Sequence, residues 1–166
     1  MEEKVTIKLK ENGVIRVPIV THDGKETGEE IIFDLEDFEL PFKLNKCKIE
    51  HEKNYKQAMK KLDEIEKMEL EENIEEGSIA TQKELKSLEV MEEFFAKETK
   101  ALDYFLGEGG TKKMLGGRHP YFSMFDDIDE MLQPVYPLLD KCYEKSIEKI
   151  KNKYSEETFK NGKLLK

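Results

Sequence analysis

The sequence contains no tryptophan, only two cysteines and only three histidines. Cys47 and Cys142 stand far apart and cannot form a disulfide framework, and no CxxC motif occurs. None of the histidines stands at metal-ligand spacing from another histidine or from a cysteine. These absences argue against a disulfide-stabilised module and against a metal site built on histidine and cysteine.

Long apolar runs are missing as well. No stretch of about 18 apolar residues occurs, so we expect no segment to span a membrane. Residues 1–10 are acidic at first and then alternating, and they lack the apolar core of a signal peptide. These features predict a cytoplasmic protein without membrane contact.

Positive charge is scarce relative to negative charge. Lysine and arginine number 28 against 37 aspartates and glutamates, which gives a formal net charge of −9. This balance disfavours nucleic-acid binding, which needs basic side chains to displace counterions from phosphates. The charge is uneven, because residues 64–76 carry seven acids and one lysine, whereas residues 141–166 carry eight lysines and four glutamates. The two segments are either solvated helix faces or patches that attract a partner or a second copy.

The first 35 residues alternate apolar and polar positions, as strands do. Three segments are predicted to be strands: residues 5–10, 14–20 and 31–35. Asn12-Gly13 and Asp23-Gly24 are turn signals. Pro18 cannot donate to a neighbouring strand, so its strand is expected at an edge or with a bulge. So small a sheet is not stable alone and must pack on helices.

Helical spacing begins near Asp34. An amphipathic helix is predicted from there to the acidic run before Gly77. Its apolar rows are Leu44, His51, Ala58 and Ile65, with Tyr55 and Leu62 beside them. Thr81 and Glu84 fit a capping box, which predicts a second long helix that ends before a left-handed Gly107. Its apolar row is Leu85, Leu88, Met91, Phe95, Leu102 and Phe105. The two helices are expected to form an antiparallel hairpin.

The remaining pattern predicts shorter helices. One lies around 111–115, another begins at Pro120, and a last one covers about 138–154, with Pro134 and Pro137 kinking or splitting the chain between them. The predicted fold is therefore mostly α, with a three-stranded β-meander at the N-terminus, an antiparallel helical hairpin and a kinked C-terminal helix pair. The predicted boundaries are 1–35 for the β-meander, 36–154 for the helical domain and 155–166 for a flexible tail.

Residues 104–120 hold five glycines and two lysines, which raises the question of a phosphate-binding loop. A P-loop needs Gly-Lys followed by Ser or Thr, after a strand. Here Gly110 is followed by Thr111, and the preceding residues have helical spacing. We expect the glycines instead to reverse the chain twice, as hinges around a short helix. The predicted hinge residues are Gly107, Gly109, Gly110, Gly116 and Gly117.

Candidate reactive groups are few. Asp126, Asp127, Asp129 and Glu130 form a dense carboxylate cluster, which is either a solvated helix face or a weak magnesium site. His51 lies on the apolar row, where we expect a packed, hydrogen-bonded histidine that can make the packing pH-sensitive. We predict no catalytic, cofactor-binding or metal-binding residue and no enzymatic activity. The alternative is a small enzyme that uses the carboxylate cluster and a divalent ion.

Two segments, residues 31–46 and 94–132, together resemble tail assembly chaperones of long-tailed phages of Gram-positive bacteria. The resemblance rests on a short β segment that leads into helices, on a glycine-rich turn and on the helix that follows the turn. The matching residues of the turn are Tyr104, Phe105, Leu106, Gly107, Gly109, Leu115, Gly116 and Gly117.

The resemblance implies a non-enzymatic protein without cofactor in the host cytoplasm. Such proteins bind the tape measure protein, keep its apolar helices soluble and hand over to tail tube subunits. They often occur in a short form and a frameshifted long form, and a chain that ends at Lys166 would be the short form. The alternative is a structural subunit of a phage tail or related particle, whose β-meander extends a neighbour's sheet.

An amphipathic hairpin can offer a groove to a partner helix, and methionine side chains adapt to varied partners. The candidate partner-binding residues are Met91, Phe94, Phe95, Phe122, Met124 and Phe125. The alternative for each of them is a place in the core. Self-association into a homo-oligomer also stays open.

Overall fold

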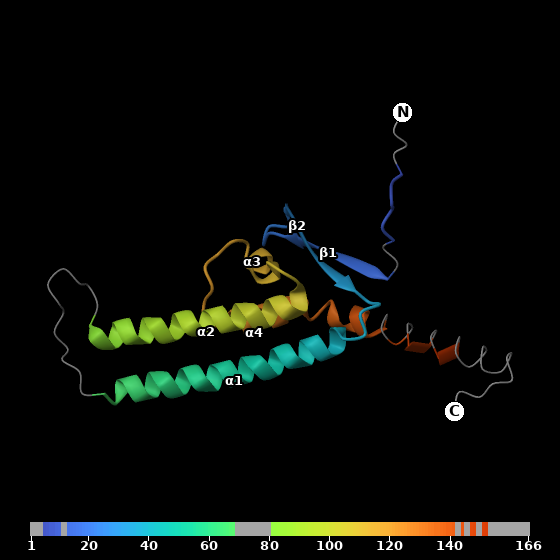
Figure 1. Ribbon diagram of the computed structural model, residues 1–166. Coiled ribbons are helices and arrows are strands. Elements are labelled where there is room, and N and C mark those ends of the chain that lie inside the picture. Colours follow the sequence, from blue (N-terminus) through green and yellow to red (C-terminus); the bar gives the residue numbers. More distant parts are fainter. Residues whose placement is uncertain are drawn as a thin grey trace, which may run out of the picture.

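The computed structural model describes residues 5–10, 13–68, 81–141, 144, 147–148 and 151–152. The chain is mostly helical, with a small sheet near its N-terminus (Figure 1). Its elements are β1 (Val14–Val20), β2 (Glu26–Asp34), α1 (Leu40–Glu66), α2 (Gln82–Leu106), α3 (Gly110–Met114) and α4 (Met124–Leu132). A further helical stretch covers residues 136–141. Within these ranges, no helix has the length and apolar character needed to cross a bilayer.

The sheet has two antiparallel strands in the part of the chain that is described, not the three that were predicted. Residues 5–10 form no strand and are exposed, and β2 begins earlier than expected, at Glu26. Val17 lies opposite Ile31, and the pairing becomes irregular between Pro18 and Val20, which agrees with the expected bulge. The alternating pattern of residues 5–10 suits a strand, but a strand also needs a sheet edge to pair with. Pro18 has no amide proton, so the edge of β1 lacks one hydrogen-bond donor.

The two long helices form the predicted antiparallel hairpin, with α1 and α2 side by side along most of their length (Figure 1). Pro41 lies in the first turn of α1, where its missing amide proton is tolerated. The capping box at the start of α2 is confirmed: the Glu84 amide donates to Thr81 Oγ1 over 3.2 Å, and the Thr81 amide donates to Glu84 Oε2 over 3.0 Å.

The second apolar row of α1 differs from the predicted one at Tyr55, whereas Leu62 is half-buried as predicted. Cys47 and Asn54 are buried in the seam, whereas Tyr55 is 41% exposed. Because Asn54 is polar, the apolar pattern did not include it and predicted instead that the neighbouring Tyr55 is buried. On α2, Leu85 and Leu88 are exposed, because the sheet, α3 and α4 all pack at the other end of the hairpin (Figure 1).

The segment after α2 follows the predicted order with shifted boundaries. The short helix α3 is confirmed, but α4 begins at Met124 rather than at Pro120. The last described helical stretch begins at residue 136, so Pro134 lies in the turn before it and Pro137 in its first turn. The predicted flexible tail, residues 155–166, lies outside the described residues.

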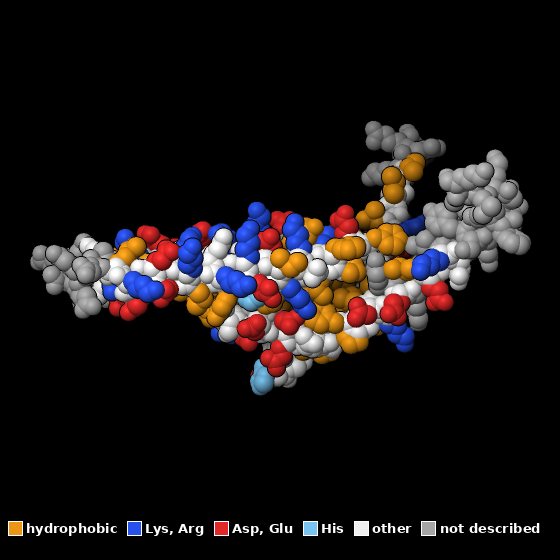
Figure 2. Space-filling model, turned by 90° about the horizontal axis from the view of Figure 1, so that it is seen from below, with side chains coloured by type: hydrophobic (Ala, Val, Ile, Leu, Met, Phe, Trp, Pro, Cys, Tyr) orange, Lys and Arg blue, Asp and Glu red, His pale blue; other side chains and the backbone are white. Residues whose placement is uncertain are grey.

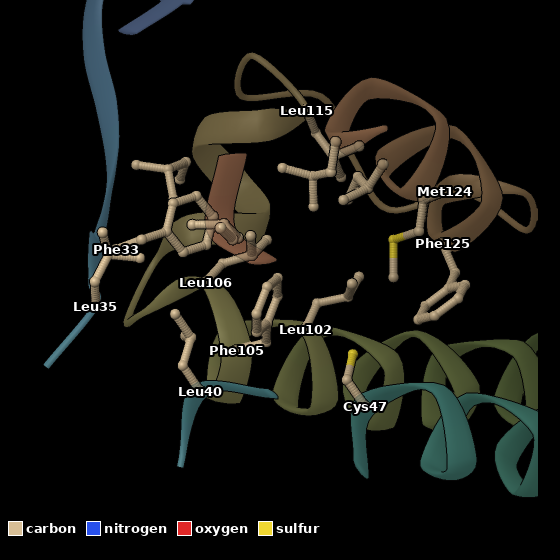
Figure 3. Packing of buried hydrophobic residues seen from close by; sticks show 14 residues of the cluster. Phe33, Leu35, Leu40, Cys47, Leu102, Phe105, Leu106, Leu115, Met124 and Phe125 are labelled. Carbon is tan, nitrogen blue, oxygen red and sulfur yellow. The ribbon is translucent and has the colours of Figure 1, made fainter. Parts of the chain in front are cut away.

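One hydrophobic core joins the sheet to the helices. Ile31, Phe33 and Leu35 extend from the strand region toward α1, α2 and α4, and Figure 3 shows Phe33 directed at the end of α2. The ring centroids of Phe33 and Phe105 lie 5.5 Å apart. The sheet, too thin to be stable alone, is thus stabilised by burial against the hairpin.

Candidate functional site

A chain of aromatic rings crosses the middle of the hairpin, and we call it the aromatic cluster. It comprises His51, Tyr55, Phe94, Phe95, His119, Phe122 and Phe125. His51 of α1 stacks on Phe125 of α4, with ring centroids 3.8 Å apart and an interplanar angle of 2°. Phe122 lies 5.7 Å from Tyr55 and 5.7 Å from Phe94, so it bridges the two long helices.

The glycine-rich corner is what brings this cluster together. After α3 the chain turns back toward the hairpin (Figure 1), so that residues 118–123 reach α1 and α2. His119 then lies with its ring centroid 6.1 Å from that of Phe95. The first turn of α4 places Met124 and Phe125 against the core (Figure 3). Residues from three segments distant in sequence therefore form one cluster.

The six residues predicted to bind a partner fall into two groups. Phe94, Met124 and Phe125 are buried, so their side chains belong to the core and offer no surface to a partner in this conformation. Met91 and Phe95 are half-buried, and Phe122 is 42% exposed. Tyr55 was expected to pack within the helix seam, but it is exposed beside Phe122, so we add it to the candidate partner-binding surface.

A buried polar network lies directly beneath the cluster. Glu98 is only 1% exposed, and its Oε2 lies 2.5 Å from His51 Nδ1. Its other carboxylate oxygen accepts a hydrogen bond from Asn54 Nδ2 over 3.1 Å. His51 is thus packed and hydrogen-bonded, as expected. Glu98 was missed, although it stands four residues after Phe94 and four before Leu102, within the apolar row.

The glycine-rich corner is closed by the chain's own carboxylate. Asp103 Oδ1 accepts from the Thr111 amide over 2.9 Å and from Thr111 Oγ1 over 2.6 Å. Asp103 Oδ2 accepts from the Gly109 amide over 3.3 Å. Amides that a phosphate-binding loop would direct at its ligand are here engaged within the protein.

The predicted hinge glycines occupy conformations that favour glycine, with one difference from expectation. Gly107, Gly109, Gly116 and Gly117 all have positive φ angles. Gly107, however, has φ 93° and ψ 163°, so the left-handed residue of the corner is Gly109, with φ 74° and ψ 4°. Gly110 is helical, but a Cβ there would lie 2.5 Å from the Leu106 Cβ, which explains its lack of a side chain.

The carboxylate cluster of α4 mostly holds neighbouring side chains in place. Asp127 accepts a hydrogen bond from the Tyr121 hydroxyl over 2.7 Å, and Asp129 accepts one from the Tyr136 hydroxyl over 2.7 Å. The bond to Asp127 raises the pKa of Tyr121, and burial together with Asp129 raises the pKa of Tyr136. Among the described residues, no group of three or more His, Cys, Asp or Glu side chains is arranged to hold a metal ion.

An open groove of about 690 Å³ runs between α1 and α2 beside the network. Its lining mixes both charges: Lys46, Lys53, Lys97 and Lys100 stand among Glu50, Asp103 and Glu108. Cys47 reaches the groove but is buried, and burial raises its thiol pKa to about 12, so it stays protonated and unreactive at neutral pH. Cys47 is therefore not an activated nucleophile.

No protein-family model matches this chain, and neither a curated protein nor a solved structure matches it significantly.

Proposed function

We propose that this chain is a non-enzymatic tail assembly chaperone, which holds an apolar helical segment of a tape measure protein on its aromatic cluster and releases it to tail tube subunits. The observation that carries this proposal is the exposure of Tyr55 and Phe122, 41% and 42%, on rings that continue into the core. The sequence resemblance of residues 31–46 and 94–132 supplies the identity of the partner.

The cluster has the features of a surface that receives a helix. Phe94 is buried beneath Phe122 and fixes it in place, so little side-chain entropy would be lost on binding. Half-buried Met91 and Phe95 extend the apolar area along α2. A polar rim of charged side chains is typical of interfaces. Figure 2 shows such charged residues alternating with exposed hydrophobic ones along the underside of the hairpin.

Co-expression with a tape measure protein, followed by pull-down, tests the proposal. The Tyr55→Ser/Phe122→Ser double variant is expected to lose capture of the tape measure protein. Phe38→Ser/Phe42→Ser is the matched control, since these rings are 49% and 70% exposed but lie outside the cluster. Far-UV circular dichroism verifies that both variants keep their helices. Equal capture by the two variants would refute the proposal.

A structural subunit of a tail or related particle is the second candidate, and the edge of β1 to which no described strand is paired favours it. Light scattering after size-exclusion chromatography, over a range of concentrations, separates the two. A stable ring or tube supports the structural subunit, whereas a small reversible oligomer or a monomer supports the chaperone.

A further inference from the structure

An apolar extended segment and an open sheet edge both lack a partner within the described chain. Val5, Ile7 and Leu9 are 88%, 90% and 89% exposed, and they alternate with polar residues as strand residues do. The described residues give β1 a single neighbouring strand, β2. A row of three aliphatic side chains in water favours any arrangement that buries it.

The hydrogen-bond pattern shows which groups of β1 remain open. The Leu35 amide donates to the Gly13 carbonyl over 2.8 Å, so Gly13 faces β2. In an antiparallel ladder alternate residues face the same neighbour, so Val14, Arg16 and Pro18 direct their backbone groups to the open edge. Pro18 offers a carbonyl but no amide proton, and the edge can therefore accept a short strand but does not favour indefinite pairing.

The side-chain pattern selects a register. Ile15, Val17 and Ile19 are partly buried against the core, on one face of β1. If Ile7 lies opposite Val17 in an antiparallel pairing, Leu9 falls opposite Ile15 and Val5 opposite Ile19. Residues directly opposite each other share a face, so all three aliphatic side chains then extend the core-facing surface, while the lysines of the segment face solvent.

We propose that residues 5–10 of one copy form a third strand on the open edge of β1 in a second copy, and that the exchange is reciprocal. In Figure 1 the N-terminal segment runs away from its own sheet, which offers it to another molecule. Reciprocal exchange fills both open edges and closes a two-fold dimer. The inference does not depend on the proposed function.

The register also predicts the salt dependence of the dimer. It places Lys8 opposite Arg16, whose side chain is already paired with Glu30. Like charges opposite each other weaken a strand pair, and salt screens them. Dimerisation is therefore expected to strengthen as ionic strength rises.

Disulfide trapping between two differently labelled chains tests the exchange. Ile7→Cys chains are mixed with Val17→Cys chains, both carrying Cys142→Ser, and oxidised gently. Residues 7 and 17 would form a non-hydrogen-bonded pair, whose side chains lie close enough for a disulfide. The expected product is a mixed disulfide dimer on a non-reducing gel. Arg16→Cys in place of Val17→Cys is the matched control and is expected to lose the cross-link, since residue 16 lies on the opposite face.

A second pair and a single-chain variant complete the test. Leu9→Cys mixed with Ile15→Cys is expected to give the same mixed dimer, which guards against one pair failing to fold. The proposal is overturned if neither mixture cross-links. It is also overturned if a chain carrying both Ile7→Cys and Val17→Cys closes its disulfide internally and stays monomeric by light scattering.

Discussion

Glu98 joins the two long helices through polar contacts inside an otherwise apolar seam. Its carboxylate contacts His51 and Asn54, and all three side chains are shielded from bulk water to a large degree. Glu98→Ala would leave the Asn54 amide buried without its acceptor. We expect the variant to lower the free energy of unfolding by about 3 to 5 kcal/mol, measured by urea denaturation.

Glu93→Ala is the matched control for this prediction. Glu93 lies on the same helix and pairs with Lys61 and Lys97, but it is exposed to solvent. Exposed ion pairs contribute little to stability, so this variant should unfold at nearly the wild-type urea concentration. Comparable destabilisation by the two variants would show that the buried network is not what stabilises the seam.

Cys47 gives the protein a pH-dependent stability at alkaline pH. Burial, with help from the negative charges of Glu98 and Asp129, raises its pKa from 9.0 to about 12. A raised pKa means that the folded state favours the neutral thiol, so this stabilisation is complete below pH 9 and is lost as the pH rises toward 12. We expect the free energy of unfolding to fall over this window more steeply in the wild type than in Cys47→Ala, as followed by urea denaturation at each pH. Parallel pH profiles would contradict the prediction.

At the scale of elements, Asp103 fastens α3 to the end of α2. It accepts hydrogen bonds from Gly109 and from both the amide and the hydroxyl of Thr111, which is 2% exposed. Asp103→Ala leaves these buried donors unpaired, and we expect a loss of about 2 to 3 kcal/mol in the free energy of unfolding.

Two comparisons identify the cause of that loss in thermal and urea unfolding. Asp103→Asn keeps one oxygen acceptor and is expected to recover part of the stability. Asp126→Ala removes an exposed carboxylate from α4 and should have little effect. If Asp103→Asn were as damaging as Asp103→Ala, the one acceptor oxygen that asparagine keeps would contribute nothing to the stability of the corner.

The elements also show where pattern analysis succeeds. Thr81 and Glu84 predicted the start of α2 to the residue, because a capping box is local chemistry between groups three positions apart. The predicted packing of Tyr55 in α1 was wrong, because its neighbour Asn54 is buried instead and bonds to Glu98 of α2, a partner that no local pattern reveals. Similarly, Leu85 and Leu88 looked like core residues, but they are exposed because no described element packs on that end of the hairpin.

At the scale of the whole molecule, the sheet and the hairpin share a core, although the sequence suggested a boundary after residue 35. Phe33 of β2 packs against Phe105 of α2, and Ile31 and Leu35 belong to the same buried cluster. The aromatic cluster is likewise a property of the whole fold, since Tyr55, Phe94 and Phe122 come from three segments. Exchange of the N-terminal strand would extend this core across two molecules.

The sequence by itself determined the mostly helical character, the capped start of α2 and the two glycine reversals, because each follows from contacts within a few residues. The hairpin could be predicted as well, because both long helices carry an apolar stripe that must be buried. Only the tertiary structure decided that residues 5–10 stay out of the sheet, that Glu98 is buried, and that Phe94, Met124 and Phe125 are core while Tyr55 and Phe122 are surface. These outcomes depend on which helix and strand faces pack together, because a side chain is buried only when an element distant in sequence covers it.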